Sequence, residues 1–200
     1  FEKSSVGATG NVLMACVNLN EKVLIKNAAM EPEIVDLCHF LIKIGVKIDG
    51  VGTSELKIVG LNNETESVNI EHTIIPDRIE AGTFLIASAI TRSDLKIVNV
   101  NPNHLIAVID ALLASGCEVE IDETSINIFP GKSIKPVNII TDIYPGYPTD
   151  LQAQWVVLMS LADGRSMVQD TIYNDRFSHI PELNRLGAQI ILEENIAYIQ

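Results

Sequence analysis

The chain has 200 residues, of which 47% are hydrophobic and 20% are charged, a composition typical of a folded protein rather than a disordered one. Its 14 Lys and Arg residues against 26 Asp and Glu residues give a formal net charge of −12, which argues against nonspecific binding to nucleic acid or to an anionic membrane surface. No apolar run is long enough for a membrane span and no secretory leader opens the chain, so we expect a soluble, cytoplasmic protein.

The cysteines and histidines lack the spacing of metal ligands, so the sequence predicts neither a metal nor another cofactor. The three cysteines lie among apolar neighbours on predicted helices or strands, and we interpret them as small core residues: Cys16, Cys38 and Cys117. The histidines show no i, i+4 pairing: His39, His72, His104 and His179.

An internal repeat is the strongest structural signal in the chain. Three predicted helix ends align on Gly45, Gly116 and Gly187, which are 71 residues apart each time. We expect each glycine to end its helix with a positive φ. Before each glycine an apolar helix, a β-rich run and an amphipathic helix follow one another, and two strands come after it. The chain therefore contains one unit, helix–strand–helix–strand–strand, three times.

The first helices of the three units are predicted at residues 8–19, 80–91 and 150–162. The β-rich runs that follow them are predicted at residues 22–28, 94–100 and 166–172. In the first unit, residues 31–44 form the amphipathic helix, and residues 46–49 and 55–59 form the two strands. Because the first helices are apolar almost all round, we expect them to be buried on every side, with the sheets outside them. The predicted fold is α/β, with a helical core and pseudo-threefold symmetry.

Two segments interrupt the repeat, residues 61–76 and 130–148, and each contains an extra strand pattern, at residues 67–75 and 136–141. The first interruption ends at Ile75 and Pro76, where we place a hinge or lobe boundary. Residues 1–75 are therefore predicted to be the C-terminal part of one lobe and to hold the first repeat. Residues 76–200 are predicted to be most of a second lobe, with the second and third repeats.

Residues 144–154, with the sequence YPGYPTDLQAQ, place one carboxylate at the start of a helix. Two prolines and a glycine exclude regular structure before it, and Thr149 to Gln152 have the pattern T-x-x-Q of a capping box. Asp150 therefore falls in the first helical turn, where it can simply complement the helix dipole. The polar residues Gln152 and Gln154 on an otherwise apolar helix favour a functional role for this segment.

Two other loops lead into the first helices of their repeats. Residues 3–10 are rich in Ser and Gly, and their backbone N–H groups, with Lys3, can attract phosphate, although the pattern is neither the P-loop nor the dinucleotide motif. In the second loop, Arg78 either forms an ion pair with Asp77 or Glu80 that caps the helix, or the loop is a rim that faces a ligand. By the symmetry of the repeat, we expect these two loops and Asp150 to share a cleft. Arg176 either clamps a carboxylate or phosphate through two contacts or pairs with Asp175.

Six motifs along the whole chain closely resemble the UDP-N-acetylglucosamine 1-carboxyvinyltransferase group of the enolpyruvyl transferase family. They are SVGATG at residues 5–10, NAAMEPEI at 27–34, PDRIEAGTF at 76–84, YPTDLQAQ at 147–154, NDRFSHIPEL at 174–183 and RLGA at 185–188. The resemblance implies an inside-out α/β barrel fold with two lobes of three units each. It also implies transfer of enolpyruvate from phosphoenolpyruvate to the 3-hydroxyl of UDP-N-acetylglucosamine, the first committed step of peptidoglycan synthesis.

The resemblance also implies roles for individual residues. Asp150 matches the aspartate that lies against the sugar 3-hydroxyl and takes its proton. The segment that binds the UDP moiety is matched by Lys3, Ser4, Ser5, Val6 and Gly7, and a further nucleotide-sugar contact by Ile172. The motifs near the cleft contain Arg176, Asp77 and Arg78.

The match lacks the family's N-terminal region, with its lysine–asparagine pair and its mobile loop, and the C-terminal part with a phosphate-binding arginine. We therefore expect a central fragment that needs the remaining parts of its parent chain as partners and has little transferase activity alone. Two alternatives stay open, a 5-enolpyruvylshikimate-3-phosphate synthase-like transferase and a noncatalytic repeat module.

Overall fold

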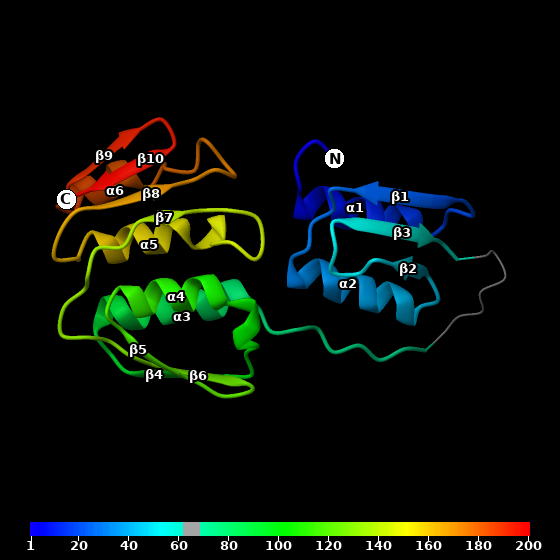
Figure 1. Cartoon of the computed structure of the whole chain (residues 1–200), viewed down its shortest axis with the longest axis horizontal. Coiled ribbons are helices and arrows are strands. Elements are labelled where there is room, and N and C mark those ends of the chain that lie inside the picture. The colour runs from blue at the N-terminus through cyan, green and yellow to red at the C-terminus, as the bar shows by residue number, and fades with distance from the viewer. Residues whose placement is uncertain (62–68) are drawn as a thin grey trace. The chain divides into compact units, whose positions relative to one another are not determined.

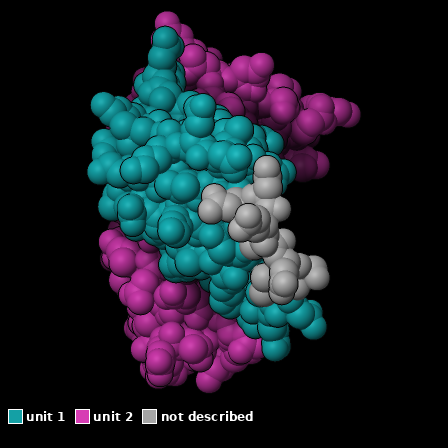
Figure 2. Space-filling model, turned by 90° about the vertical axis from the view of Figure 1, so that its right-hand side faces the viewer, with its two compact units in different colours: residues 1–75 teal, residues 76–200 magenta. Residues whose placement is uncertain are grey.

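The computed structural model describes residues 1–61 and 69–200. These residues divide into two compact units, Phe1–Ile75 and Pro76–Gln200, which are drawn in separate colours in Figure 2. The division falls at the position where the sequence places a hinge. The assignment of each unit to a lobe of a larger protein stays a prediction.

Unit 1 packs two helices against a three-stranded antiparallel sheet of order β1-β3-β2 (Figure 1). Its elements are α1 (Val6–Cys16), β1 (Lys22–Lys26), α2 (Pro32–Lys43), β2 (Lys47–Asp49) and β3 (Glu55–Val59). In β3, Leu56 and Ile58 are buried while Glu55 and Lys57 are exposed, the period-2 pattern of a strand with one face on the core. The apolar face of α2 covers that core with Ile34, Cys38 and Leu41.

Unit 2 contains two sheets with helices α3, α4 and α5 between them (Figure 1). Its first part consists of α3 (Arg78–Thr91), β4 (Leu95–Val98), the 3₁₀ turn η1 (Pro102–His104), α4 (Ile106–Ala114), β5 (Glu118–Ile121) and β6 (Ser125–Phe129). Its second part consists of β7 (Ile139–Ile140), the 3₁₀ turn η2 (Thr149–Leu151), α5 (Gln152–Met159), β8 (Ser166–Gln169), α6 (Ile180–Arg185), β9 (Ile190–Glu193) and β10 (Ile196–Ile199). One continuous core, with Leu85, Leu112 and Trp155, fills the space between the sheets.

The two sheets of unit 2 have the orders β4-β6-β5 and β7-β8-β10-β9. All their strand pairs are antiparallel except β7 with β8, which run parallel. This parallel pair places the loop after β7 beside the loop after β8 at one end of the sheet, where both strands end. The predicted helices inside and sheets outside are confirmed for this unit.

The threefold repeat of the sequence is confirmed, because the order helix–strand–helix–strand–strand recurs with β7 as an insertion. Gly45, Gly116 and Gly187 have φ values of +106°, +100° and +104°. After each glycine, the next backbone N–H donates to a carbonyl five residues back, at 3.0 Å for Val46 and 3.1 Å for Cys117. A helix end with this hydrogen bond requires a positive φ at the residue after the helix, which explains why each of the three positions is a glycine.

Several expectations from the sequence need correction. Helices α1 and α3 are not buried on every side, since Met14 is 53% and Phe84 is 54% exposed, whereas α5 has no exposed residue. The third repeat begins with a 3₁₀ turn, and its helix ends at Met159 rather than at residue 162. Residues 69–75 form no strand, residues 67 and 68 lie outside the described part, and the strand predicted at 136–141 is only the two-residue β7. Within the described residues no sheet closes into a barrel.

The interpretation of the cysteines as core residues is confirmed, because Cys16, Cys38 and Cys117 are all buried free thiols. Burial raises the pKa of Cys38 to about 11 and also raises the pKa of Cys16. In the part of the chain that the structure describes, no helix is long and apolar enough to cross a membrane.

Candidate functional site

The predicted capping box at the start of α5 is wrong. The Thr149 hydroxyl donates to the carboxylate of Asp170, Oγ1 to Oδ2, at 2.6 Å instead of accepting from a helix N–H group. A hydrogen bond to a carboxylate is stronger than one between neutral groups, which explains why the Thr149 hydroxyl bonds to Asp170 and not to a helix N–H group. The Gln152 side chain is fully buried, and neither of its amide atoms has a hydrogen-bond partner among the described residues. The segment therefore begins as the 3₁₀ turn η2, and Asp150 lies within it.

Asp150 forms an ion pair with Arg176. Arg176 Nη2 donates to Asp150 Oδ1 at 2.6 Å, and Nη1 donates to Thr149 Oγ1 at 3.1 Å. The guanidinium carbon also lies 5.3 Å from the centre of the Tyr173 ring, within the range of a cation–π contact. The side chains of Asp150 and Arg176 are 51% and 41% exposed, so a ligand can reach both groups. The sequence offered Asp175 as the partner of Arg176, and the structure shows Asp150 instead.

Asp170, which sequence reasoning did not single out, is the buried centre of this region. Its side chain is fully buried. Oδ1 accepts hydrogen bonds at 2.9 Å from Thr141 Oγ1 and from the backbone N–H groups of Ile172 and Tyr173, while Oδ2 accepts from Thr149. A signal was present in the sequence, because an Asp directly after a strand often accepts backbone N–H groups two and three residues ahead.

These contacts bring the predicted residues Asp150, Ile172 and Arg176 together at one end of unit 2. Ile172 is half-buried, and Asp170 holds its N–H. The parallel pairing of β7 with β8 places residues 141–151 beside residues 170–176, although the two segments are far apart in the chain. The resulting arrangement combines the exposed carboxylate of Asp150 and the exposed guanidinium of Arg176 with the buried, hydrogen-bonded side chain of Asp170. Such a pair can accept a proton from a neutral hydroxyl and hold an anionic group nearby.

At the start of α3, Asp77 is a helix cap. Asp77 Oδ1 accepts hydrogen bonds from the N–H groups of Ile79 at 2.8 Å and Glu80 at 3.1 Å. Arg78 is largely buried, and its guanidinium carbon lies 5.5 Å from the centre of the Tyr144 ring. Asp77 therefore has the capping role that the sequence offered as one alternative, and Arg78 contacts the loop that precedes η2.

In unit 1, the loop with Lys3 and Ser4 leads into α1, which begins at Val6. Ser5 caps this helix, since its hydroxyl oxygen accepts a hydrogen bond from the N–H of Ala8 at 3.2 Å. Lys3 and Gly7 are exposed, and a Cβ added at Gly7 would have no neighbour within 4 Å. These residues are thus accessible, but they belong to a different unit from Asp150. The shared cleft stays a prediction.

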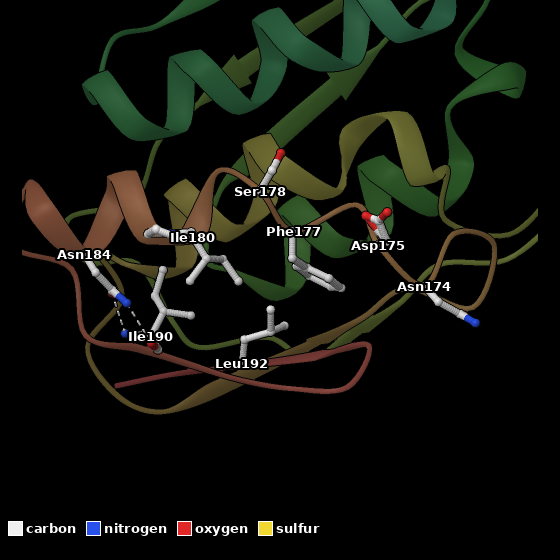
Figure 3. Close-up of a pocket in the computed structure, with 9 residues that line it drawn as sticks. Asn174, Asp175, Phe177, Ser178, Ile180, Asn184, Ile190 and Leu192 are labelled. Atoms are coloured by element: carbon white, nitrogen blue, oxygen red, sulfur yellow. Dashed lines mark hydrogen bonds between the residues drawn. The ribbon is translucent and has the colours of Figure 1, made fainter.

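A separate open pocket of about 590 Å³ lies between α6, β9 and the segment that precedes α6 (Figure 3). The side chains of Phe177, Ile180 and Leu192 contribute its apolar wall, and Asn184 exchanges two hydrogen bonds with the backbone of Ile190. None of the residues that the sequence singled out as site residues lines this pocket. Its lining residues are Asn174, Asp175, Phe177, Ser178, Ile180, Pro181, Asn184, Ile190 and Leu192.

The chain is similar to known proteins over its whole length. All 200 residues, 1–200, match the family described as EPSP synthase (3-phosphoshikimate 1-carboxyvinyltransferase). The chain belongs to the EPSP synthase family. Curated relatives named UDP-N-acetylglucosamine 1-carboxyvinyltransferase are 46% identical in Campylobacter hominis and 49% identical in Aliarcobacter butzleri, over 199 residues in each case. Each alignment covers 100% of this chain and 47% of the relative.

The chain therefore spans about half the length of the curated relatives that it matches. Among solved structures, the enolpyruvyl transferase NikO from Streptomyces tendae matches 97% of this EPSP synthase family chain with a TM-score of 0.85 at 22% sequence identity. That alignment covers 46% of NikO. The expected enolpyruvyl transferase fold is confirmed by this similarity.

Proposed function

We propose that the full-length protein carrying this chain transfers enolpyruvate from phosphoenolpyruvate to the 3-hydroxyl of UDP-N-acetylglucosamine, as a cytoplasmic step of peptidoglycan synthesis. The observation that carries the proposal is the identity of 46% and 49% with relatives named for this activity, over the entire chain. The structure adds that the carboxylate of Asp150 is accessible and is held by a hydrogen bond from Arg176.

In the proposed reaction, Asp150 accepts the proton of the sugar 3-hydroxyl. The sugar oxygen forms a bond to C2 of phosphoenolpyruvate, and the bond between C2 and the phosphate oxygen breaks, so that inorganic phosphate leaves. A sugar hydroxyl is a poor nucleophile, which is why a base within hydrogen-bond reach is required. Arg176 contacts Oδ1 of Asp150, so we expect Oδ2 to face the hydroxyl.

The remaining site residues are proposed to bind substrate. Lys3 and the N–H groups near Ser4, Ser5, Val6 and Gly7 would hold the UDP phosphates, because a cation and unpaired N–H groups at a helix start favour anions. Ile172 would contact the nucleotide sugar through its backbone or side chain. Arg78 would lie at the rim of the site, positioned by the cap that Asp77 forms.

The test is phosphate release by the full-length protein with phosphoenolpyruvate and UDP-N-acetylglucosamine. We expect Asp150→Asn to lower kcat by roughly 10²–10⁴-fold, the usual contribution of a general base. Asp175→Asn is the matched control, because it removes the same charge from an exposed neighbouring residue. Turnover with shikimate 3-phosphate in place of the nucleotide sugar, or full activity of the Asp150→Asn variant, would contradict the proposal.

The nucleotide-binding segment is tested separately by titrating the 200-residue chain with UDP-N-acetylglucosamine in calorimetry. We expect saturable binding that Lys3→Ala weakens and that Lys22→Ala, a change of the same exposed residue type on β1, leaves unaltered. Equal affinity of the Lys3→Ala variant and the unchanged chain would show that Lys3 does not take part in binding.

A further inference from the structure

The hydrogen bonds around Thr149 have a fixed direction. The Thr149 hydroxyl donates its proton to Oδ2 of Asp170 across the 2.6 Å contact. The lone pairs of Thr149 Oγ1 then face away from Asp170, and Arg176 Nη1 donates to that oxygen at 3.1 Å. The second nitrogen of the same guanidinium, Nη2, donates to Asp150. Asp170, Thr149, Arg176 and Asp150 thus form one hydrogen-bonded chain, in which Arg176 donates to both Thr149 and Asp150 and Thr149 donates to Asp170.

A second path runs from Asp170 to the same arginine. Asp170 Oδ1 accepts the N–H of Tyr173 at 2.9 Å, and the ring of Tyr173 lies 5.3 Å from the guanidinium carbon of Arg176. The backbone carbonyl of Asp170 is also held, by the side-chain amide of Asn195 at 2.8 Å. Arg176 is long, flexible and 41% exposed, so its orientation depends on contacts of this kind.

We propose that Asp170 is a positioning residue for the transfer reaction. Through Thr149 and Tyr173 it orients Arg176, and Arg176 in turn sets the carboxylate of Asp150. This inference rests on the proposed function, because it assigns Asp150 the role of base. It gives a function to the fully buried side chain of Asp170. Misplacing a reacting group by about 1 Å can lower a rate by roughly 10²-fold, so the arrangement of this chain affects kcat.

The central experiment compares Thr149→Val with Thr149→Ser in the full-length protein. Valine has nearly the same shape as threonine but cannot relay the hydrogen bond, whereas serine retains the hydroxyl. We expect Thr149→Val to lower kcat by roughly 10–100-fold with a change in the KM for phosphoenolpyruvate of less than about 3-fold. Thr149→Ser should stay within about 3-fold of the unchanged protein.

Thr83→Val is the control for loss of stability. Thr83 accepts one side-chain hydrogen bond in the same unit, from Gln154 Nε2 at 3.1 Å, and it has no contact with Arg176 among the hydrogen bonds that the structure describes. If Thr149→Val and Thr83→Val lower the melting temperature to a similar degree but only the former lowers kcat, the effect is one of positioning.

Asp170→Asn tests the carboxylate itself and tests whether Asp170 and Thr149 act on Arg176 through the same hydrogen bonds. Asparagine places an N–H donor where Oδ2 accepts, so the Thr149 hydroxyl loses its acceptor and can no longer donate to residue 170. We expect a loss of kcat similar to that of Thr149→Val, and a double variant no worse than the more damaged single variant. If the two losses of kcat multiply in the double variant, Asp170 and Thr149 act independently and the proposal is wrong on this point.

Crystal structures of the Thr149→Val and Thr149→Ser variants give a readout that does not depend on the reaction. The proposal expects Arg176 to leave Asp150 in the former and to keep the contact in the latter. If the unchanged protein does not use UDP-N-acetylglucosamine, the proposed function fails, and these structures still decide whether the Asp170–Thr149 hydrogen bond holds Arg176 on Asp150. If it does use the nucleotide sugar but Thr149→Val and Asp170→Asn are as active as Thr83→Val, the positioning role is refuted and the function stands.

Discussion

Gln154 on α5 donates a hydrogen bond to Thr83 on α3, Nε2 to Oγ1, at 3.1 Å, and the two residues are 71 positions apart. That separation equals the period of the repeat, so Thr83 and Gln154 occupy equivalent places in the second and third units. The equivalent helices of the repeat therefore meet at equivalent residues. The contact also explains why an otherwise apolar helix carries Gln154, since a polar group at this helix contact needs a partner.

The same helix contact predicts the effect of enlarging Gly82. A Cβ at Gly82 would lie 2.5 Å from Cδ1 of Leu151, which is fully buried. We expect Gly82→Ala to destabilise unit 2 by about 1–3 kcal/mol, because the Leu151 side chain must move within a packed core. The measurement is urea unfolding of the chain followed by the fluorescence of its one tryptophan, Trp155. The control is the same change in a Leu151→Ala background, where the clash is absent. An equal loss in both backgrounds would show that Leu151 is not the cause.

The helix-ending glycines allow a test of backbone conformation alone. Gly187 has a φ of +104°, and a Cβ there would have no neighbour within 4 Å. Gly187→Ala should therefore cost about 1–2 kcal/mol through backbone strain without any steric clash. Gly187→Asn should cost less, because Asn tolerates positive φ better than Ala. Unfolding in urea measures both variants, and an unchanged midpoint for Gly187→Ala would contradict the role of φ.

The buried thiol of Cys38 predicts a loss of stability at alkaline pH. Its pKa is raised to about 11 in the folded chain against 9.0 ordinarily. Between these values the unfolded state loses the thiol proton and the folded state keeps it, so stability falls as the pH rises from about 9 to 11. The slope contributed by one group is at most about 1.4 kcal/mol per pH unit. Unfolding at pH 8 and pH 10 should show a smaller drop for Cys38→Ala than for the unchanged chain, and parallel profiles would refute this.

His179 predicts the opposite trend at acid pH. Burial lowers its pKa below the ordinary 6.5, and its Nε2 has no hydrogen-bond partner in the described parts of the chain. Below pH 6.5 the unfolded state binds a proton that the folded state does not yet bind, so unit 2 loses stability as the pH falls. We expect His179→Gln to lack this part of the slope between pH 7.5 and 5.5. An NMR titration that places the pKa of His179 at or above 6.5 would contradict the prediction.

Local patterns in the sequence determined the elements and the repeat. Gly45, Gly116 and Gly187 mark helix ends because positive φ is a property of single residues, and the apolar periods around them define helices and strands without reference to distant contacts. The motifs around Asp150 and Arg176 likewise identified two residues that the structure joins at 2.6 Å. Their mutual contact was not predicted, since Asp175 is nearer to Arg176 in sequence.

Only the tertiary structure decided how the polar groups pair. Thr149 and Gln152 have the spacing of a capping box, yet the Thr149 hydroxyl donates to Asp170, a carboxylate 21 residues later in the chain. The parallel pairing of β7 with β8 brings that carboxylate within reach, and a two-residue strand gives too weak a pattern to predict the pairing. A donor can bond to any acceptor that lies within about 3 Å in the folded chain, whereas spacing in the sequence identifies only the acceptors that are near it along the chain.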